Sequence, residues 1–133
     1  MQSIDELPTL RLVTLRRLVR LTVPPIIFDQ ETPIGVVEDI LAQLPDATAV
    51  LIDGSRIYQG TLRLHDLFAC DRTSPVEQVM SLQTPVLLGE DDIDAAQAAM
   101  SSSETDRVLV IAPDGELLGV LTDRDLADRK RAA

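Results

Sequence analysis

Aromatic residues are scarce in this sequence. Phe, Tyr and Trp together make up 2% of its 133 residues, and Trp is absent. A hydrophobic core must therefore come from Leu, Val, Ile and Ala, which a hydrophobic content of 45% permits. Long apolar runs are lacking too, because no stretch approaches the roughly 18 residues that a membrane span needs. We therefore expect a soluble globular chain without a membrane span, forming one domain or two small halves that share a core.

Cysteine and histidine each occur once. Cys70 cannot form an internal disulfide, which favours a reducing compartment, and we expect a cytoplasmic protein. His65 has no cluster of Cys or Glu beside it, so the sequence does not indicate a metal site. Neither a P-loop nor a pairing of nucleophile and base is recognisable. We therefore predict that the chain is not an enzyme.

Positive charge is also in short supply. Lys and Arg number 12 against 22 Asp and Glu, which gives a net charge of −10 at pH 7. A surface of this sign repels the phosphate backbone of DNA or RNA. Nucleic acid is therefore not an expected partner.

The most informative stretch of the chain covers residues 114–126. It begins with an Asp-Gly turn signal, continues as a strand-like apolar run that contains Gly119, and ends with Thr122 three residues before Asp125. Gly119 lets another backbone or a ligand come close to the strand. A helix start binds phosphate through its unpaired N–H groups, whereas a carboxylate such as Asp125 suits ribose hydroxyls. The same Thr and Asp also fit a plain helix cap, so context decides between the two interpretations.

That context is an internal repeat. Both halves predict the order strand, helix, strand, strand, helix, and several pairs of residues keep nearly the same separation. The separation is 60 for Pro25 and Pro85 (85 minus 25), and 59 for Gly60 and Gly119 (119 minus 60). The expected strands cover residues 25–28, 49–52, 57–62, 85–88, 108–111 and 117–121. Helical segments are expected over 9–22 and 75–80, and further helices are expected to start at Thr32, Leu64, Asp92 and Thr122.

This tandem arrangement resembles the CBS-domain family. The residues that carry the resemblance are 76–80, 84–86, 107–111 and 114–126 in the second repeat, with a divergent copy around residues 25–27, 53–54 and 60–67. The implied fold is α/β: a tandem CBS-domain pair of two β-α-β-β-α repeats related by pseudo-twofold symmetry, called a Bateman module. The expected divisions are a leader (1–13), motif 1 (14–70), a connector (71–74), motif 2 (75–128) and a basic tail (129–133).

The resemblance also implies a ligand. Such pairs bind adenosyl compounds in the cleft between their halves: AMP, ADP, ATP, S-adenosylmethionine or, in some members, cyclic dinucleotides. By this resemblance Asp125 would hold the ribose hydroxyls, Thr122 the ribose or phosphate oxygens, and Arg124 a phosphate. Arg107 is a further candidate at the edge of the cleft. The base pocket would be lined by the first strand of the same repeat, at Thr84, Pro85 and Val86.

The first repeat departs from the pattern at its own ligand-binding end. Arg63 stands where the second repeat has Thr122, and Asp66 stands where it has Asp125. The Arg63 guanidinium could fill the cleft, reach the phosphates of a ligand in the other site, or pair with Asp66. One competent site per chain, none, or two are the resulting alternatives, and the first is our prediction.

The expected function is regulatory. The resemblance implies a module that binds an adenosyl small molecule, needs no cofactor, forms a homodimer and modulates an effector protein of unknown identity. The alternative is a structural dimerisation module with degenerate clefts. A third possibility is the sensor region of a larger transporter, kinase or synthase.

Overall fold

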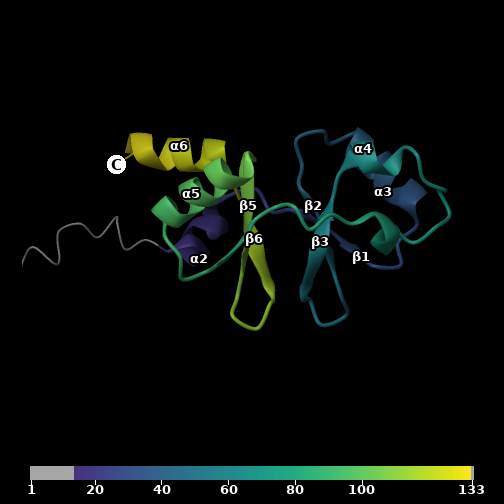
Figure 1. Ribbon diagram of the computed structural model, residues 1–133, viewed down its shortest axis with the longest axis horizontal. Coiled ribbons are helices and arrows are strands. Elements are labelled where there is room, and N and C mark those ends of the chain that lie inside the picture. The colour runs from purple at the N-terminus through teal and green to yellow at the C-terminus, as the bar shows by residue number, and fades with distance from the viewer. Residues whose placement is uncertain (1–13, 133) are drawn as a thin grey trace, which may run out of the picture. The chain divides into compact units, whose positions relative to one another are not determined.

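A computed structural model describes residues 14–132, so the expected leader (1–13) and residue 133 lie outside the described residues (Figure 1). The predicted order of strand, helix, strand, strand, helix occurs twice, and the mixed α/β class is confirmed. The segment before the first repeat and that repeat contain α2 (Leu15–Leu18), η2 (Val19–Leu21), β1 (Ile26–Asp29), α3 (Ile34–Ala42), β2 (Ala49–Ile52), β3 (Tyr58–Leu62) and α4 (Leu64–Leu67). The remainder contains η3 (Val76–Val79), β4 (Val86–Leu88), α5 (Ile93–Ser103), β5 (Arg107–Ile111), β6 (Leu117–Thr122) and α6 (Asp123–Ala132).

The described chain forms two compact units whose limits differ from those of the repeats. Unit 1 combines residues 14–24, 85–113 and 118–132, and unit 2 combines 25–84 and 114–117. The segment that precedes each repeat therefore packs with the other repeat. The boundaries between leader, motifs, connector and tail stay a prediction from the sequence.

Unit 2 is built on a three-stranded sheet in the order β1-β2-β3. Strand β1 runs parallel to β2, with Ile26 opposite Ala49, and β3 runs antiparallel to β2, with Leu62 also opposite Ala49. A parallel pair needs a crossover connection, which α3 provides. The sheet and its helices enclose a buried aliphatic core that contains Ile34, Val37, Leu51 and other residues.

The start of α3 differs from the prediction. The sequence predicts a helix start capped by Thr32, but Pro33 is the N-cap and makes no side-chain cap bond. The main chain of the connector takes that role, because Ile34 N–H donates to the Ser74 carbonyl (2.9 Å) and Gly35 N–H donates to that of Arg72 (2.9 Å). Distant carbonyls cannot accept from a helix start without this tertiary contact, so local sequence did not reveal it.

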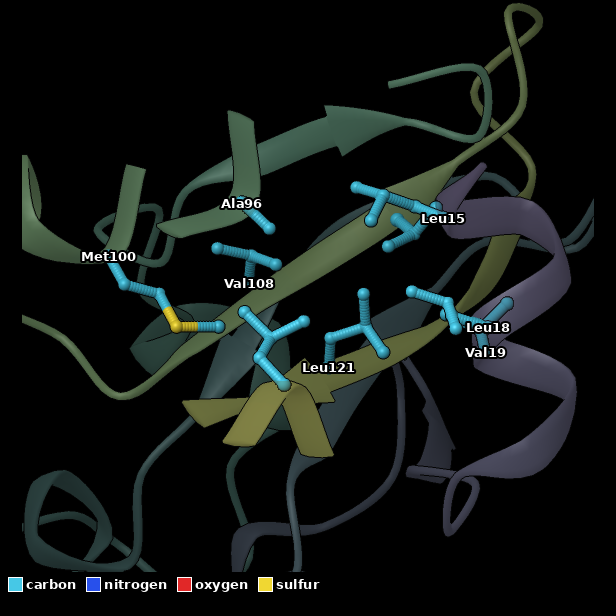
Figure 2. Close-up of a cluster of buried hydrophobic side chains, with 9 residues drawn as sticks. Leu15, Leu18, Val19, Ala96, Met100, Val108 and Leu121 are labelled. Carbon is cyan, nitrogen blue, oxygen red and sulfur yellow. The ribbon is translucent and has the colours of Figure 1, made fainter. Parts of the chain in front are cut away.

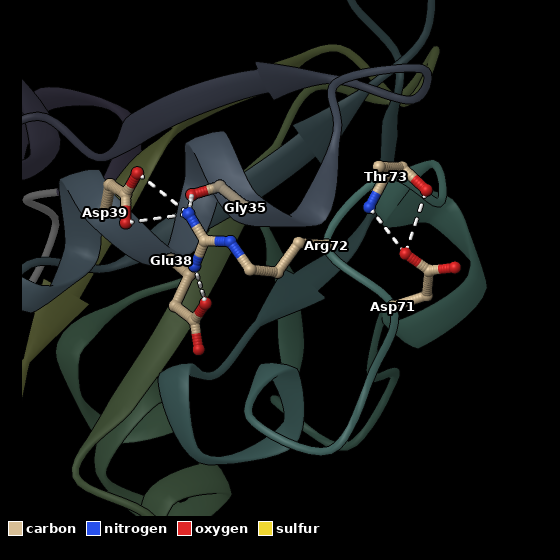
Figure 3. Close-up of polar contacts among 6 residues, drawn as sticks. All are labelled: Gly35, Glu38, Asp39, Asp71, Arg72 and Thr73. Atoms are coloured by element: carbon tan, nitrogen blue, oxygen red, sulfur yellow. Dashed lines mark hydrogen bonds and ion pairs between the residues drawn. The ribbon is translucent and has the colours of Figure 1, made fainter.

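Side chains of the connector strengthen the same contact (Figure 3). The Arg72 guanidinium forms ion pairs with Glu38 and Asp39 of α3, the second at 3.0 Å. Thr73 donates to Asp71 Oδ1 from its backbone N–H (2.9 Å) and its hydroxyl (2.8 Å), and these bonds lower the pKa of that carboxyl group. The connector is thus an ordered part of unit 2.

Unit 1 has the sheet β4-β5-β6 and a core built from several separate segments. Figure 2 shows side chains of α2 and η2 pointing toward those of β5, β6 and α5. The buried cluster consists of Leu15, Leu18, Val19, Ala96, Met100, Val108, Val110, Leu121 and Leu126. The helix predicted over 9–22 is observed as α2 followed by the 3-10 helix η2, and residues 9–13 of that prediction lie outside the described residues.

Helix α5 begins as predicted. The Asp92 carboxylate accepts a hydrogen bond from the Ala95 N–H (2.9 Å), which is the N-cap expected from the sequence. The helix ends at Glu104, which has a left-handed backbone with φ of 52°. The predicted helix start at Asp92 is therefore confirmed, because α5 begins at Ile93. The predicted start at Leu64 is confirmed as well, since α4 begins at that residue.

The turn at Gly115 requires glycine. Its φ is +96°, and a Cβ at this position would lie 3.1 Å from Ile57 Cγ2. We predict that Gly115→Ala lowers the free energy of unfolding by about 1–2 kcal/mol, since an L side chain strains this backbone. Chemical denaturation measures the change. Gly54→Ala is the control, because Gly54 has no atom within 4 Å of its Cβ position and should tolerate Ala without loss. Equal stability of the two variants would contradict this assignment.

Tyr58 carries a hydroxyl that is buried and, within the described part of the chain, has no hydrogen-bond partner. Burial raises the pKa of Tyr58 from 10.0 to about 12. A raised pKa in the folded state means that the stabilising contribution is complete below pH 10 and is lost as the pH rises through 12. Because Tyr58 is the only tyrosine, the ultraviolet absorbance of tyrosinate reports it alone. We predict a midpoint near 12 in the folded chain and near 10 in denaturant. A folded-state midpoint near 10 would show that the ring is solvated.

Candidate functional site

The predicted ligand-binding end of the second repeat is a reciprocal pair of hydrogen bonds. Thr122 N–H donates to Asp125 Oδ2 (2.9 Å), and Asp125 N–H donates to Thr122 Oγ1 (3.2 Å). This is a capping box, in which the residues before and inside the first helical turn satisfy each other's N–H groups. Both residues are half-buried. Asp125 Oδ1 makes no hydrogen bond to another described residue, so it can accept one from a bound molecule.

Strand and helix together place this pair. Strand β6 ends at Thr122, and the next N–H, that of Asp123, donates to the Asp106 carbonyl (2.8 Å) just before β5. Leu121 and Leu126 on either side of the pair are buried in the core of unit 1. The turn between strand and helix is thereby fixed at both ends, and the orientation of the Asp125 carboxylate follows from it.

The two predicted arginines of this repeat differ in their surroundings. Arg124, in the first turn of α6, is exposed. Arg107 donates to both carboxylate oxygens of Asp106, at 3.0 and 3.3 Å, and this hydrogen bonding lowers the pKa of the Asp106 carboxyl group. Arg107 is therefore already bound to its neighbour, whereas Arg124 extends from the helix start.

The residues predicted to line a base pocket are divided between the two units along the chain. Pro85 and Val86 belong to unit 1, where the Pro85 carbonyl accepts from the Leu109 N–H (2.9 Å) and Val86 begins β4. Thr84 belongs to unit 2, and its hydroxyl lies 3.3 Å from that of Thr61. Pro85 and Val86 thus share a unit with Thr122 and Asp125, and Thr84 is held by the other one.

The first repeat has an ion pair in place of the capping box. Arg63 Nε donates to Asp66 Oδ2 at 2.9 Å, and Asp66 N–H donates to the Arg63 carbonyl (2.9 Å). Of the three alternatives for Arg63, pairing with Asp66 is the one described. The carboxylate that would correspond to Asp125 is thus engaged by a cation.

Gly119 has a packing role. A Cβ on this residue would lie 2.8 Å from Val19 Cβ, so the atoms that come close belong to η2. The equivalent Gly60 in the first repeat is approached by Met80 Cβ and by the Ser81 carbonyl, each at 3.1 Å. The atoms that come close to these glycines therefore belong to the protein itself. Each glycine leaves room for the segment that precedes the other repeat.

Thr61 is a polar residue that sequence analysis did not select. Among the described residues, Thr61 is the polar residue that is buried, with 4% exposure. Its hydroxyl donates to the Ser81 carbonyl at 3.2 Å. Its equivalent 59 positions later is Val120, which is buried as well. The sequence signal that could have identified Thr61 is this difference between the repeats: a hydroxyl stands where the other repeat has an aliphatic side chain.

Comparisons with known proteins agree with this fold. Residues 76–131 match the family model of the CBS domain. The described chain has the fold of a CBS-domain pair. The resemblance seen in the sequence and the predicted fold class are therefore both confirmed. No curated protein sequence matches the chain significantly. Among residues 14–127, whose side chains are described, no cluster of His, Cys, Asp or Glu could hold a metal ion.

Solved structures show the same architecture at low sequence identity. A CBS-domain pair and ACT-domain protein from Thermotoga maritima is 17% identical, with a TM-score of 0.76, and the match covers 90% of this chain and 97% of that one. A CBS-domain protein from Pyrobaculum aerophilum in complex with AMP is 22% identical, with a TM-score of 0.71 and coverage of 91% and 100%. The cytosolic domain of the Mg2+ channel MgtE in complex with ATP is 21% identical, with a TM-score of 0.69; this chain is covered to 79% and spans 44% of that domain's length. No helix of the described chain is long and apolar enough to cross a membrane.

The contact at Gly119 gives a direct test of its role. We predict that Gly119→Ala lowers the free energy of unfolding by about 1–3 kcal/mol, since the added methyl group overpacks the contact with Val19. Urea denaturation without any ligand measures this change, with Gly54→Ala as the uncrowded control. Wild-type stability in Gly119→Ala would mean that the space above Gly119 is open to a ligand.

Proposed function

We propose that this chain is a regulatory module that binds an adenosyl nucleotide through the second repeat. The proposal rests on the hydrogen bonding of the Asp125 carboxylate. One of its oxygens accepts from the Thr122 N–H in the helix cap, which holds the carboxylate in place. Its other oxygen is available to a ribose hydroxyl. The complexes of the Pyrobaculum protein with AMP and of the MgtE domain with ATP support an adenine nucleotide as the ligand class.

Charge at the start of α6 supports a division of labour within that ligand. The first turn contains Asp123, Arg124 and Asp125, so two carboxylates stand beside one guanidinium. Carboxylates accept hydrogen bonds from ribose and repel phosphate, while the exposed Arg124 attracts phosphate. We propose that the sugar lies at Asp125 and Thr122, and that the phosphate extends toward Arg124.

One competent site per chain follows from the contrast between the repeats. In the first repeat, Asp66 Oδ2 accepts from the Arg63 guanidinium at 2.9 Å, so this carboxylate is paired with a cation, whereas Asp125 Oδ2 accepts only from a backbone N–H. The pair is partly exposed and therefore contributes little to stability, but a ligand would have to break it. We propose that Arg63 and Asp66 take no part in binding ribose.

A regulatory role requires that the ligand favour one conformation over another. A nucleotide shifts an equilibrium only by its difference in affinity for the two states. We propose that binding changes the pose presented to an effector protein, that the chain acts as a homodimer, and that it catalyses no reaction. The larger MgtE domain offers a precedent for such a pair within a longer chain, since this chain spans 44% of it.

Ligand-dependent melting of the purified chain tests the proposal. AMP, ADP, ATP and S-adenosylmethionine are each added, and at about 100 times its Kd a ligand raises the free energy of unfolding by ~2.7 kcal/mol. We predict such a rise with at least one of them. Asp125→Ala should lower the stability of the ligand-free chain by about 1 kcal/mol through loss of the cap, and should also abolish the rise.

Asp66→Ala is the matched control, since it removes the equivalent carboxylate of the first repeat and should leave the ligand-induced rise intact. If Asp125→Ala is less stable but keeps the full rise, Asp125 is a helix cap only. If the wild-type chain shows no rise with any of the four compounds, the structural dimerisation module with degenerate clefts is the better account.

A further inference from the structure

Helix α3 and the turn that follows it expose an apolar stripe, which consists of Val36, Ile40 and Leu44. These residues are 46%, 37% and 48% exposed. Residues four apart lie on one side of a helix, and Leu44 continues the line because the Gln43 and Leu44 N–H groups donate to carbonyls of the last turn (3.2 and 3.1 Å). The buried core of unit 2 uses other residues of α3, so the stripe is a second apolar face of this helix.

The second repeat shows that the fold does not need this stripe. At the separation of 59 positions (95 minus 36), its equivalents in α5 are Ala95, Ala99 and Ser103. Helix α5 is nevertheless complete, although these positions carry two methyl groups and a hydroxyl. A row of large apolar side chains on a surface marks an interaction site when the core does not use it. The presence of the stripe in one repeat only therefore indicates a binding surface.

The surroundings of the stripe are strongly acidic. Unit 2 contains 11 Asp and Glu and 3 Arg, a net charge of −8 (3 minus 11), whereas the described residues of unit 1 contain 9 acidic and 8 basic residues, a net charge of −1 (8 minus 9). The segment 29–46, which includes the stripe, has five acidic residues and neither Lys nor Arg. Arg72 offsets part of this charge through its ion pairs with Glu38 and Asp39 (Figure 3). A surface complementary to it is apolar at its centre and basic at its edges.

We propose that the apolar stripe is the docking site for an amphipathic basic helix of the effector protein. Apolar side chains of that helix cover the stripe, and its Lys or Arg residues face the carboxylates of segment 29–46. Two copies of this chain that met through the stripe would bring two acidic surfaces together, so the proposed homodimer uses another face. The inference rests on the proposed function for the existence of an effector, and its test uses no nucleotide.

The probe is a fluorescent model peptide of about 18 residues, with Leu on one helical face and Lys on the other. Fluorescence anisotropy measures its affinity for the full-length chain. A peptide of the same composition in scrambled order has the same charge but no apolar face, and it should bind about tenfold more weakly or worse. The double variant Val36→Ser/Leu44→Ser should weaken binding of the amphipathic peptide by about tenfold or more, because two apolar contacts are lost.

Leu21→Ser is the matched control, since it replaces a 65% exposed apolar residue of unit 1 and should leave the peptide affinity unchanged. Circular dichroism of each variant should match wild type, because the replaced side chains are exposed.

Equal affinity of wild type and the double variant for the amphipathic peptide overturns the proposal, as does equal binding of the two peptides by wild type. Sedimentation tests the alternative occupant: a wild-type dimer that the double variant converts to a monomer would assign the stripe to a second copy and overturn the proposal too. A chain that binds the peptide as expected but no nucleotide contradicts the proposed ligand and leaves this docking site standing.

Discussion

The structure depends on one kind of close contact. In each unit, a strand glycine packs against the segment that precedes the other repeat. Val19 approaches Gly119 in unit 1, and Met80 with Ser81 approaches Gly60 in unit 2. Any side chain at these glycines would push the segment away. Each unit therefore takes part of its core from a segment outside its own repeat.

Helix capping and the proposed ligand binding involve the same residues at the start of α6. The capping box uses one oxygen of Asp125, and it thereby orients the other without a dedicated supporting residue. Removing a cap costs about 1 kcal/mol, so the box alone is worth keeping for stability. The first repeat shows the alternative outcome, since Arg63 neutralises Asp66 and the helix start carries no hydroxyl cap. One duplicated motif thus supports two different local chemistries.

Much of this architecture could be predicted from the sequence because its signals are local. The capping of α5 by Asp92 and the reciprocal pair at Thr122 each lie within four residues, and strand composition located the sheets. The start of α3 could not be predicted, because a carbonyl 40 residues away (74 minus 34) caps Ile34. The role of Thr61 was missed for the same reason, since its partners come from a segment about 20 residues further along the chain.

The central claim is that the Asp125 carboxylate accepts hydrogen bonds from a ribose. The most direct measurement compares the affinity of the wild-type chain for AMP with that for 2′,3′-dideoxyadenosine monophosphate, which lacks both hydroxyls. Hydrogen bonds to a charged group are worth about 1.5–3 kcal/mol, so the account predicts a loss of about tenfold or more for the dideoxy compound. Equal affinity of the two nucleotides would contradict it.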